Sequence, residues 1–167
     1  MEDSIGEIII RNIRGEELPC LEDMLYNAIF QPDSFIPISR EIINNPEIRL
    51  YIENFGQKED DHCLVAIFDK EIIGAVWVRI LSGDIRGYGN IDKHTPEFAI
   101  SLHEKFRNRG YGTLLMKKMI ALLKDKDYKQ ASLSVNKDNY AVNMYKKLGF
   151  EIIQENKEDF IMLLKLD

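Results

Sequence analysis

The residues with the clearest chemical meaning form a short run in the second half of the chain, at positions 107–112. The run follows an apolar stretch that is expected to be a strand and precedes a stretch with helical periodicity. A helix that begins here presents free main-chain N–H groups and the positive end of its dipole, and both attract phosphate. Gly110 and Gly112 let the main chain approach an anion closely, and Arg107 and Arg109 add positive charge. These features predict a cradle for a diphosphate group.

Two other phosphate-binding motifs do not fit this run. A P-loop requires Gly-Lys-Ser/Thr at the helix start, whereas the sequence has Gly112-Thr113-Leu114. The dinucleotide fingerprint requires a third glycine, and Leu115 occupies that position. A turn that only needs two flexible residues also produces Gly-x-Gly, so from the run alone that alternative stays open.

The hydrophobic pattern along the chain predicts one mixed α/β domain over residues 1–167. The stretch at 97–103 is mostly apolar and is therefore expected in the centre of the sheet. Helices are expected where apolar residues recur at helical spacing, and strands in runs rich in Val and Ile. The expected strands are 8–13, 64–68, 72–81, 97–103, 131–135, 150–153 and 160–166, and the expected helices are 18–29, 40–54 with an interruption near Pro46, 113–124 and 139–148.

Composition and charge exclude several classes of function. The chain has 22 Lys and Arg against 28 Asp and Glu, which gives a net charge of −6 and disfavours nucleic-acid binding. No apolar run reaches the roughly 20 residues that span a bilayer, and the first residues lack a signal-peptide pattern. We therefore expect a cytoplasmic protein that binds neither nucleic acid nor membrane. The two cysteines and three histidines show no metal-ligand spacing, so no metal site is predicted.

Two sequence blocks resemble the GCN5-related N-acetyltransferase (GNAT) family. The first is Arg107-x-x-Gly110-x-Gly112, which matches the family signature Arg/Gln-x-x-Gly-x-Gly/Ala. The second runs from Asn139-Tyr140-Ala141 to Tyr145-Lys146-Lys147-Leu148-Gly149-Phe150 and is similar to the family block Asn-x-x-Ala…Tyr-x-Lys-x-Gly-Phe. The resemblance is close over residues 96–150 and looser over the rest. It implies an α/β fold with a mixed, mostly antiparallel sheet of about seven strands and helices on both faces.

The resemblance also implies a cosubstrate, acetyl-CoA, and residues that bind it. The signature loop and the first helical turn would hold the pyrophosphate, main-chain groups of the central strand would hold the pantetheine arm, and Asn139 would lie beside that arm. An amine then attacks the thioester directly, and Tyr145 matches the family position that often protonates the departing thiolate. The implied cofactor-binding residues are Ile100, Leu102, Arg107, Asn108, Arg109, Gly110, Tyr111, Gly112, Thr113 and Asn139.

Each implied role has a structural alternative. Asn139 is also a favourable helix cap, and Tyr145 shares a helix face with apolar residues and is packed in any case. The general base has several candidates: Glu97 is the best placed, His103, Glu104 and His94 are others, and a water would also serve.

The acceptor is the part of the reaction that the sequence leaves open. It is a small-molecule or peptide amine if the resemblance holds, and a homodimer is compatible with the same observations. Alternatives are a non-catalytic acyl-CoA sensor and an acyltransferase that uses a hydroxyl acceptor or a longer acyl chain. Aromatic residues in the region expected to recognise the acceptor are mostly expected in the core, with one or two lining the cleft: Tyr26, Phe30, Phe35, Tyr51, Phe55 and Trp77.

Overall fold

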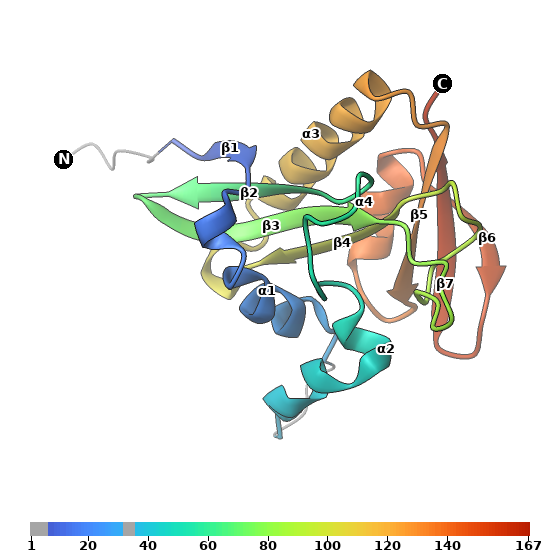
Figure 1. Ribbon diagram of the computed structural model, residues 1–167, viewed down its shortest axis with the longest axis horizontal. Helices are drawn as coiled ribbons and strands as arrows, with labels where there is room; N and C mark the ends of the chain where they lie inside the picture. The colour runs from blue at the N-terminus through green and yellow to red at the C-terminus, as the bar shows by residue number, and fades with distance from the viewer. Residues whose placement is uncertain (1–6, 32–35) are drawn as a thin grey trace.

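A seven-stranded sheet organises the molecule, which we describe from a computed structural model over residues 7–31 and 36–167 (Figure 1). The strand order is β1-β2-β3-β4-β5-β7-β6, and every neighbouring pair is antiparallel except β4 and β5. The expected mixed, mostly antiparallel sheet is therefore confirmed. The strands are β1 (Ile9–Asn12), β2 (His62–Phe68), β3 (Glu71–Arg79), β4 (Glu97–Leu102), β5 (Gln130–Asn136), β6 (Glu151–Glu155) and β7 (Asp159–Lys165).

Helices cover both faces of this sheet, as expected. In Figure 1, α1 and α2 lie below the sheet and α3 lies above it. The core is accordingly in two parts, one with α3 and α4 on one face and one with α1 and the segment after α2 on the other. The α-helices are α1 (Cys20–Ala28), α2 (Pro46–Arg49), α3 (Tyr111–Asp125) and α4 (Ala141–Lys147), and short 3₁₀ helices are η1 (Gly15–Glu17), η2 (Arg40–Asn44) and η3 (Glu104–Phe106).

The long helix α3 follows its apolar stripe. Leu115, Met116, Met119 and Leu123 are fully buried against the sheet, at the spacing of one helix face. α4 is shorter and ends at Gly149, whose φ of +106° is the left-handed conformation that favours glycine after a helix. The buried side chains of α4 itself are Val142 and Tyr145.

The expected helix at 40–54 is the main correction to the element assignment. The segment forms a 3₁₀ helix, then the four-residue α2, then turns, so the interruption expected near Pro46 is present but the helix after it is much shorter than expected. The side chain of Asn45 accepts a hydrogen bond from the N–H of Glu47 and Pro46 follows at the first helical position, so a new helix starts where the earlier one ends. Phe35, one of the aromatic candidates, lies outside the described residues.

The parallel pair β4 and β5 separates soon after it forms. The two strands pair only at Glu97 and Ser132, although β4 continues to Leu102 and β5 to Asn136. Beyond this point the edge of β4 that faces β5 has no neighbouring strand. The splayed part leads directly to the start of α3.

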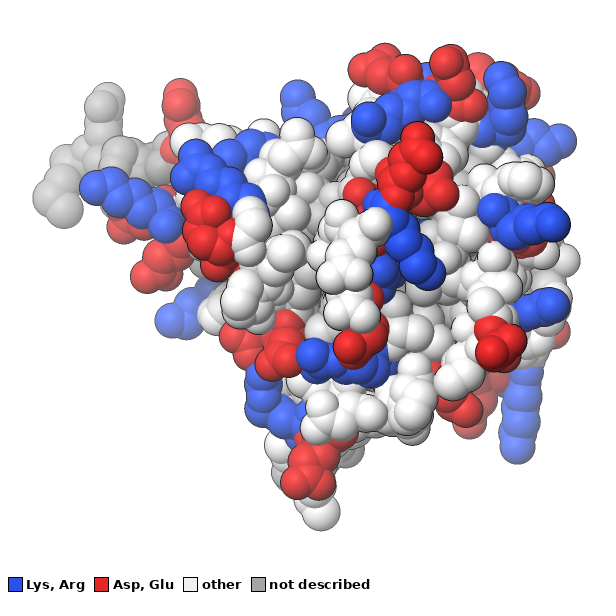
Figure 2. All heavy atoms as spheres, in the orientation of Figure 1, with Lys and Arg blue, Asp and Glu red and all other residues white. Residues whose placement is uncertain are grey.

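Helix length and surface charge complete the description of the fold. No helix within residues 7–31 and 36–167 is both long and apolar enough to cross a bilayer. On the face shown in Figure 2, Lys and Arg are interspersed with Asp and Glu rather than gathered into one basic patch.

Candidate active site

The start of α3 presents a run of unpaired main-chain amides. Gly110 is the N-cap residue, and no side chain caps the helix. Leu114 donates the first hydrogen bond of the helix, to the carbonyl of Gly110 at 3.1 Å. For the N–H groups of residues 108–113, no acceptor is found in the described part of the chain. Free amides in the loop and first turn of a helix, together with the positive end of its dipole, favour the binding of an anion.

The two signature glycines, Gly110 and Gly112, differ in their backbone conformation. Gly110 has a φ of +85°, and Asn108 is also left-handed with a φ of +62°, so the chain turns sharply just before the helix. Gly112 differs, because its conformation is helical. A Cβ added there would lie 3.5 Å from Leu102 Cδ1 and 3.6 Å from Met144 Sδ, which is ordinary contact. The protein itself therefore leaves room for a Cβ at Gly112, so its own packing does not require glycine there.

Gly112 also marks the point where the predicted segments meet. Its two nearest side chains come from the end of β4 and from α4, so the signature loop, the central strand and the Tyr145 helix converge here. The arginines of the loop lie around it. Arg107 Nε donates to the carbonyl of Leu102 at 3.1 Å, and the Arg109 guanidinium lies over the ring of Phe106 at 5.7 Å. Both cations are thus anchored beside the free amides.

The splayed edge of β4 supplies further donors. His103 N–H bonds to the carbonyl of Ile73 on β3 at 2.7 Å, and successive residues of a strand direct their main-chain groups to opposite sides. Ile100 and Leu102 therefore direct theirs towards β5, where the pairing has already ended. Their position matches the main-chain role that the family resemblance implied.

Tyr145 lies on the inner face of α4 with little exposure. It is 7% exposed, and its ring contacts that of Phe150 edge to face with centroids 5.9 Å apart. Burial raises the pKa of its hydroxyl, so the group keeps its proton at neutral pH. No hydrogen bond of this hydroxyl to another described residue is found. The group is both a packed core residue and a protonated donor without a protein acceptor.

Asn139 caps the start of α4. Its Oδ1 accepts a hydrogen bond from Ala141 N–H at 2.9 Å, so the capping alternative is what the structure displays. Asn139 also stands two residues before Ala141, whereas the family block places its Asn three before the Ala. In this chain the residue three positions before Ala141 is Asp138. The contribution of Asn139 to a pantetheine site accordingly has less support than that of the loop.

Glu97 is the most unusual polar residue of the site. It is 2% exposed at the start of β4, on the face covered by α1 and the turns that follow α2. Its Oε2 accepts hydrogen bonds from Tyr51 Oη at 2.5 Å and from Gly89 N–H at 3.1 Å, whereas Oε1 has no partner among the described residues. Burial raises the pKa of this carboxyl to about 7, against the lowering effect of these two hydrogen bonds. Such a group exchanges protons near neutral pH.

The other base candidates lie in different surroundings. The side chain of His103 accepts from Lys105 N–H at the start of η3 and so acts as a cap. Glu104 and His94 are exposed at the surface. None of these groups shares the enclosed environment of Glu97.

The residues around Glu97 were not identified as a group from the sequence. Tyr88 N–H donates to Tyr51 Oη at 2.9 Å, and Ser132 Oγ donates to the carbonyl of Gly89 at 2.7 Å, which fixes the 87–89 segment over β4 and β5. Tyr51 was singled out only as an aromatic. No sequence signal could have joined it to Glu97, because the two are 46 positions apart and Tyr51 lies in an irregular turn.

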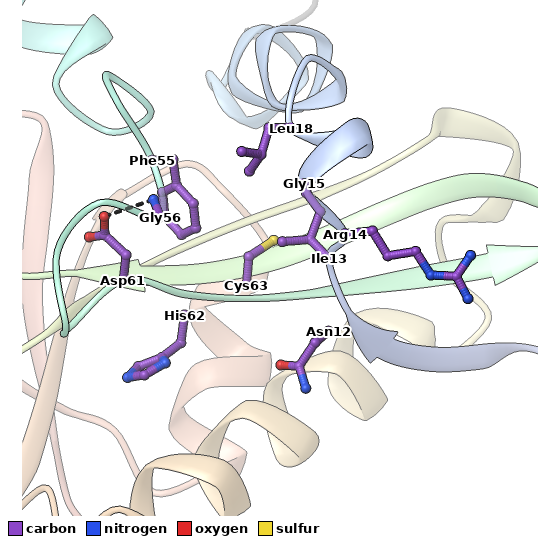
Figure 3. A pocket seen from close by; sticks show the side chains of 10 residues that line it. All are labelled: Asn12, Ile13, Arg14, Gly15, Leu18, Phe55, Gly56, Asp61, His62 and Cys63. Carbon is purple, nitrogen blue, oxygen red and sulfur yellow. Dashed lines mark hydrogen bonds between the residues drawn. The ribbon is translucent and has the colours of Figure 1, made fainter.

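A separate cavity of about 330 Å³ opens near the start of α1 (Figure 3). Leu18, Phe55 and Cys63 lie around its middle, while Arg14 and His62 point away from them. Its carboxylate, Asp61, is fully buried and already paired with Arg79 at 3.0 Å. The cavity thus offers no free charged group and is lined by none of the residues of the signature loop.

The fold and the site define an acyltransferase of known type. A sequence profile described as the acetyltransferase (GNAT) family matches residues 25–150, and the chain belongs to that family. The expected family, fold and class of enzyme are confirmed. The chain is an acetyltransferase.

Individual relatives refine this picture. The L-amino acid N-acetyltransferase AaaT of Escherichia coli K12 is 27% identical over 150 residues, which cover 89% of this chain and 85% of that protein. A GNAT-family acetyltransferase from Streptococcus pneumoniae superposes with a TM-score of 0.68 at 18% identity, covering 96% and 100% of the two chains. The PaiA N-acetyltransferase from Thermoplasma acidophilum, solved in complex with coenzyme A, gives 0.67 at 21% identity, covering 95% and 99%. These two structures support the fold.

Proposed function

We propose that the protein transfers the acetyl group of acetyl-CoA to a primary amine of a small molecule or peptide, by direct attack in a ternary complex. One observation carries the cosubstrate assignment: the N–H groups of residues 108–113 have no acceptor in the described chain. A diphosphate supplies several acceptor oxygens and negative charge at the positive end of α3. Arg107 and Arg109 lie beside it, and the missing side chain of Gly112 leaves room.

The pantetheine arm then runs along the splayed edge of β4. It is an amide-containing chain, and the main-chain groups of Ile100 and the N–H of Leu102 can bond to it as a neighbouring strand would, while the Leu102 carbonyl is held by Arg107. Thr113, in the first turn of α3, and Asn139, at the start of α4, complete the proposed cofactor contacts. A strand N–H at the same edge also stabilises the oxyanion that forms when the amine attacks the carbonyl.

Two side chains are proposed to move protons. Tyr145 stays protonated because burial raises its pKa, so it can donate to the departing CoA thiolate. Glu97, with a pKa of about 7, accepts the proton of the amine directly or through one ordered water. The two lie in different parts of the core, Tyr145 with α3 and α4 and Glu97 on the opposite face of the sheet. An amine that enters from the Glu97 face would meet the thioester at the splayed edge of β4, where the sheet is open.

Cosubstrate binding is the first test. A ligand present at about a hundredfold excess over its Kd stabilises the folded protein by about 2.7 kcal/mol, which raises Tm by several degrees for a chain of this size. CoA and acetyl-CoA are expected to give this shift in a melting experiment. Pantetheine, which lacks the diphosphate, should give a much smaller one. Equal shifts from all three would place the anion cradle elsewhere, and no shift from any would contradict the proposal.

The acceptor is found by a screen for free CoA thiol released from acetyl-CoA. L-Amino acids come first, because the Escherichia coli relative is an L-amino acid N-acetyltransferase. Peptides with an N-terminal alanine come next, since a structural neighbour is a ribosomal-protein-S18-alanine N-acetyltransferase. Alcohols and longer acyl-CoA thioesters complete the panel. Turnover with alcohols alone, or only with longer acyl chains, would replace the N-acetyl assignment.

A further inference from the structure

Tyr51 and Glu97 are joined by the shortest link between two side chains in the candidate site. The hydroxyl of Tyr51 donates to Glu97 Oε2 at 2.5 Å, and Tyr88 N–H donates to the same hydroxyl at 2.9 Å. The hydroxyl therefore has its proton directed at the carboxylate and one of its lone pairs engaged. When Glu97 is ionised, its carboxylate can only accept, so in that form the Tyr51 hydroxyl is the donor of this hydrogen bond.

The rest of Tyr51 is held in place before any substrate binds. Its carbonyl accepts from Trp77 Nε1 at 3.1 Å, and its ring stacks on that of Tyr88 with centroids 6.4 Å apart. Arg79 donates to the carbonyls of Leu50 and Glu53 at 2.9 and 2.8 Å and so fixes the turn on both sides of Tyr51. A hydroxyl anchored in this way keeps one position relative to β4.

Within the part of the chain that the structure describes, no cation is paired with Glu97. Arg79 stands opposite it in the β3–β4 register, but the guanidinium is engaged with Asp61 and with the two carbonyls. From β5, Ser132 faces this region and donates to Gly89 rather than to Glu97. From the loop, Gly89 gives its N–H, and the hydroxyl of Tyr88 turns to Glu47. Among the described residues, Tyr51 is thus the only side chain that donates a hydrogen bond to this carboxyl.

We propose that Tyr51 is a positioning residue for acetyl transfer, whose hydroxyl orients the Glu97 carboxyl and stabilises its ionised form. The inference rests on the proposed role of Glu97 as the base. Tyr51 itself does not lose its proton, because burial and the neighbouring carboxylate both raise the pKa of its hydroxyl. It therefore acts through Glu97 rather than on the substrate.

The proposal has a consequence with a definite sign. A hydrogen bond to the ionised form lowers the pKa of a carboxyl, so removing the Tyr51 hydroxyl must raise the pKa of Glu97 above its present value of about 7. A hydrogen bond to a charged group has the strength to shift the pKa by about one to two units. In Tyr51→Phe the ring stack and the Trp77 bond are retained, so the hydroxyl is the only group lost.

The experiment titrates Glu97 directly in the full-length protein. The side-chain ¹³C carboxyl signal of Glu97 is assigned by its absence in Glu97→Gln and followed with pH in wild type and in Tyr51→Phe. Tyr128→Phe is the matched control, because Tyr128 also donates to a carboxylate, Asp60 at 2.6 Å, away from Glu97. The pH profile of kcat/KM for the best amine is measured on the same three proteins.

We expect the Glu97 titration to move up by about one to two units in Tyr51→Phe and to stay unchanged in Tyr128→Phe. The acid limb of the kcat/KM profile should move with it. An unchanged Glu97 titration in a folded Tyr51→Phe would overturn the inference. If the titration moves but the kinetic limb does not, Tyr51 still orients Glu97, and the assignment of Glu97 as the base is what fails. If no amine is acetylated, the titration alone decides on Tyr51.

Discussion

Gly87 lies directly against the carboxylate of Glu97. A Cβ added at Gly87 would come 2.1 Å from Oε1, which is closer than real contacts allow, and 3.0 Å from Leu81 Cβ, which is tight. The glycine therefore has a role beyond flexibility, since it leaves space for a buried carboxyl that already receives two hydrogen bonds on its other oxygen. The position of Glu97 depends on three separate segments: the turn with Tyr51, the loop with Gly87 and Gly89, and β4 itself.

Gly87→Ala should displace the Glu97 carboxylate, because the end of a side chain yields before the backbone does. A misplacement by about 1 Å can reduce turnover about 10²-fold, and we expect a loss of that order in kcat/KM for the amine. The Kd for CoA, measured by calorimetry, should not change. Gly83→Ala is the control, since a Cβ there meets nothing within 4 Å in the same loop. Equal activities of the two variants would show that the position of Glu97 is not important for turnover.

Glu97→Gln tests the buried charge through stability. In the folded protein the pKa of Glu97 is raised from 4.5 to about 7, so the native state binds this proton more tightly than the unfolded chain does. The stabilisation by the proton is complete below the unfolded pKa and is lost as pH rises from about 4.5 through 7. At about 1.4 kcal/mol per unit, the loss is on the order of 3 kcal/mol. Glutamine does not titrate and cannot show this loss.

Urea unfolding at pH 4.5 and pH 8 gives the comparison. From the lower to the higher pH, wild type should lose about 2 to 3 kcal/mol of unfolding free energy relative to Glu97→Gln. Other groups titrate in both proteins and cancel in the difference. A difference that is the same at both pH values would mean that Glu97 ionises normally.

Local sequence patterns predicted the part of the site that one continuous segment builds. Residues 97–125 form a strand, a turn with two glycines and an amphipathic helix, and each feature depends on residues close together in the chain. The loop needs glycine at Gly110 for its positive φ, and the helix needs its apolar stripe, so both leave a trace in the sequence. The same holds for α4 and the glycine that ends it.

Contacts between distant segments left no such trace. Tyr51 reaches Glu97 across 46 positions, from a turn without periodicity. The splay of β4 from β5 is also invisible in the sequence, because both strands keep their apolar pattern after their pairing ends. The order of the last two strands is a further case. β7 lies inside and the more exposed β6 forms the edge of the sheet, although both read simply as strands.

Gly112→Asp tests the anion cradle. The protein accommodates a Cβ at this position at ordinary distances, so the variant should fold. A carboxylate about 4 Å from the pyrophosphate is repelled by about 1 to 4 kcal/mol, which weakens CoA binding roughly 5- to 1,000-fold. Gly112→Asn has nearly the same shape without the charge and separates steric from electrostatic loss. Calorimetry should give a higher CoA Kd for Gly112→Asp than for Gly112→Asn, and the difference between the two Kd values should become smaller at high salt. Identical Kd values for wild type and Gly112→Asp would remove the pyrophosphate from this loop.

Tyr145→Phe tests the proposed proton donor, and the structure makes it a clean substitution. The hydroxyl has no hydrogen-bond partner among the described residues, and the ring contact with Phe150 is retained, so folding should be little affected. If Tyr145 protonates the thiolate, kcat should fall roughly 10²- to 10⁴-fold, the usual range for a lost general acid. The KM for acetyl-CoA should move little, because the lost interaction matters mainly in the transition state. Steady-state kinetics with the best amine measure both quantities. Tyr128→Phe is the control, because it also removes one tyrosine hydroxyl.

The pattern of the result distinguishes the roles of Tyr145. A large fall in kcat with unchanged Tm identifies a proton donor. Full activity in Tyr145→Phe would mean that water protonates the thiolate, or that the thiolate leaves unprotonated, and that Tyr145 is only a core residue. An acetyl thioester with a more acidic thiol offers a second check. If the Tyr145 hydroxyl donates a proton, this thioester should lose less activity in Tyr145→Phe than acetyl-CoA does. The reason is that a less basic thiolate gains less from protonation. An equal loss for both thioesters would argue against proton donation and for a packing effect on the bound geometry.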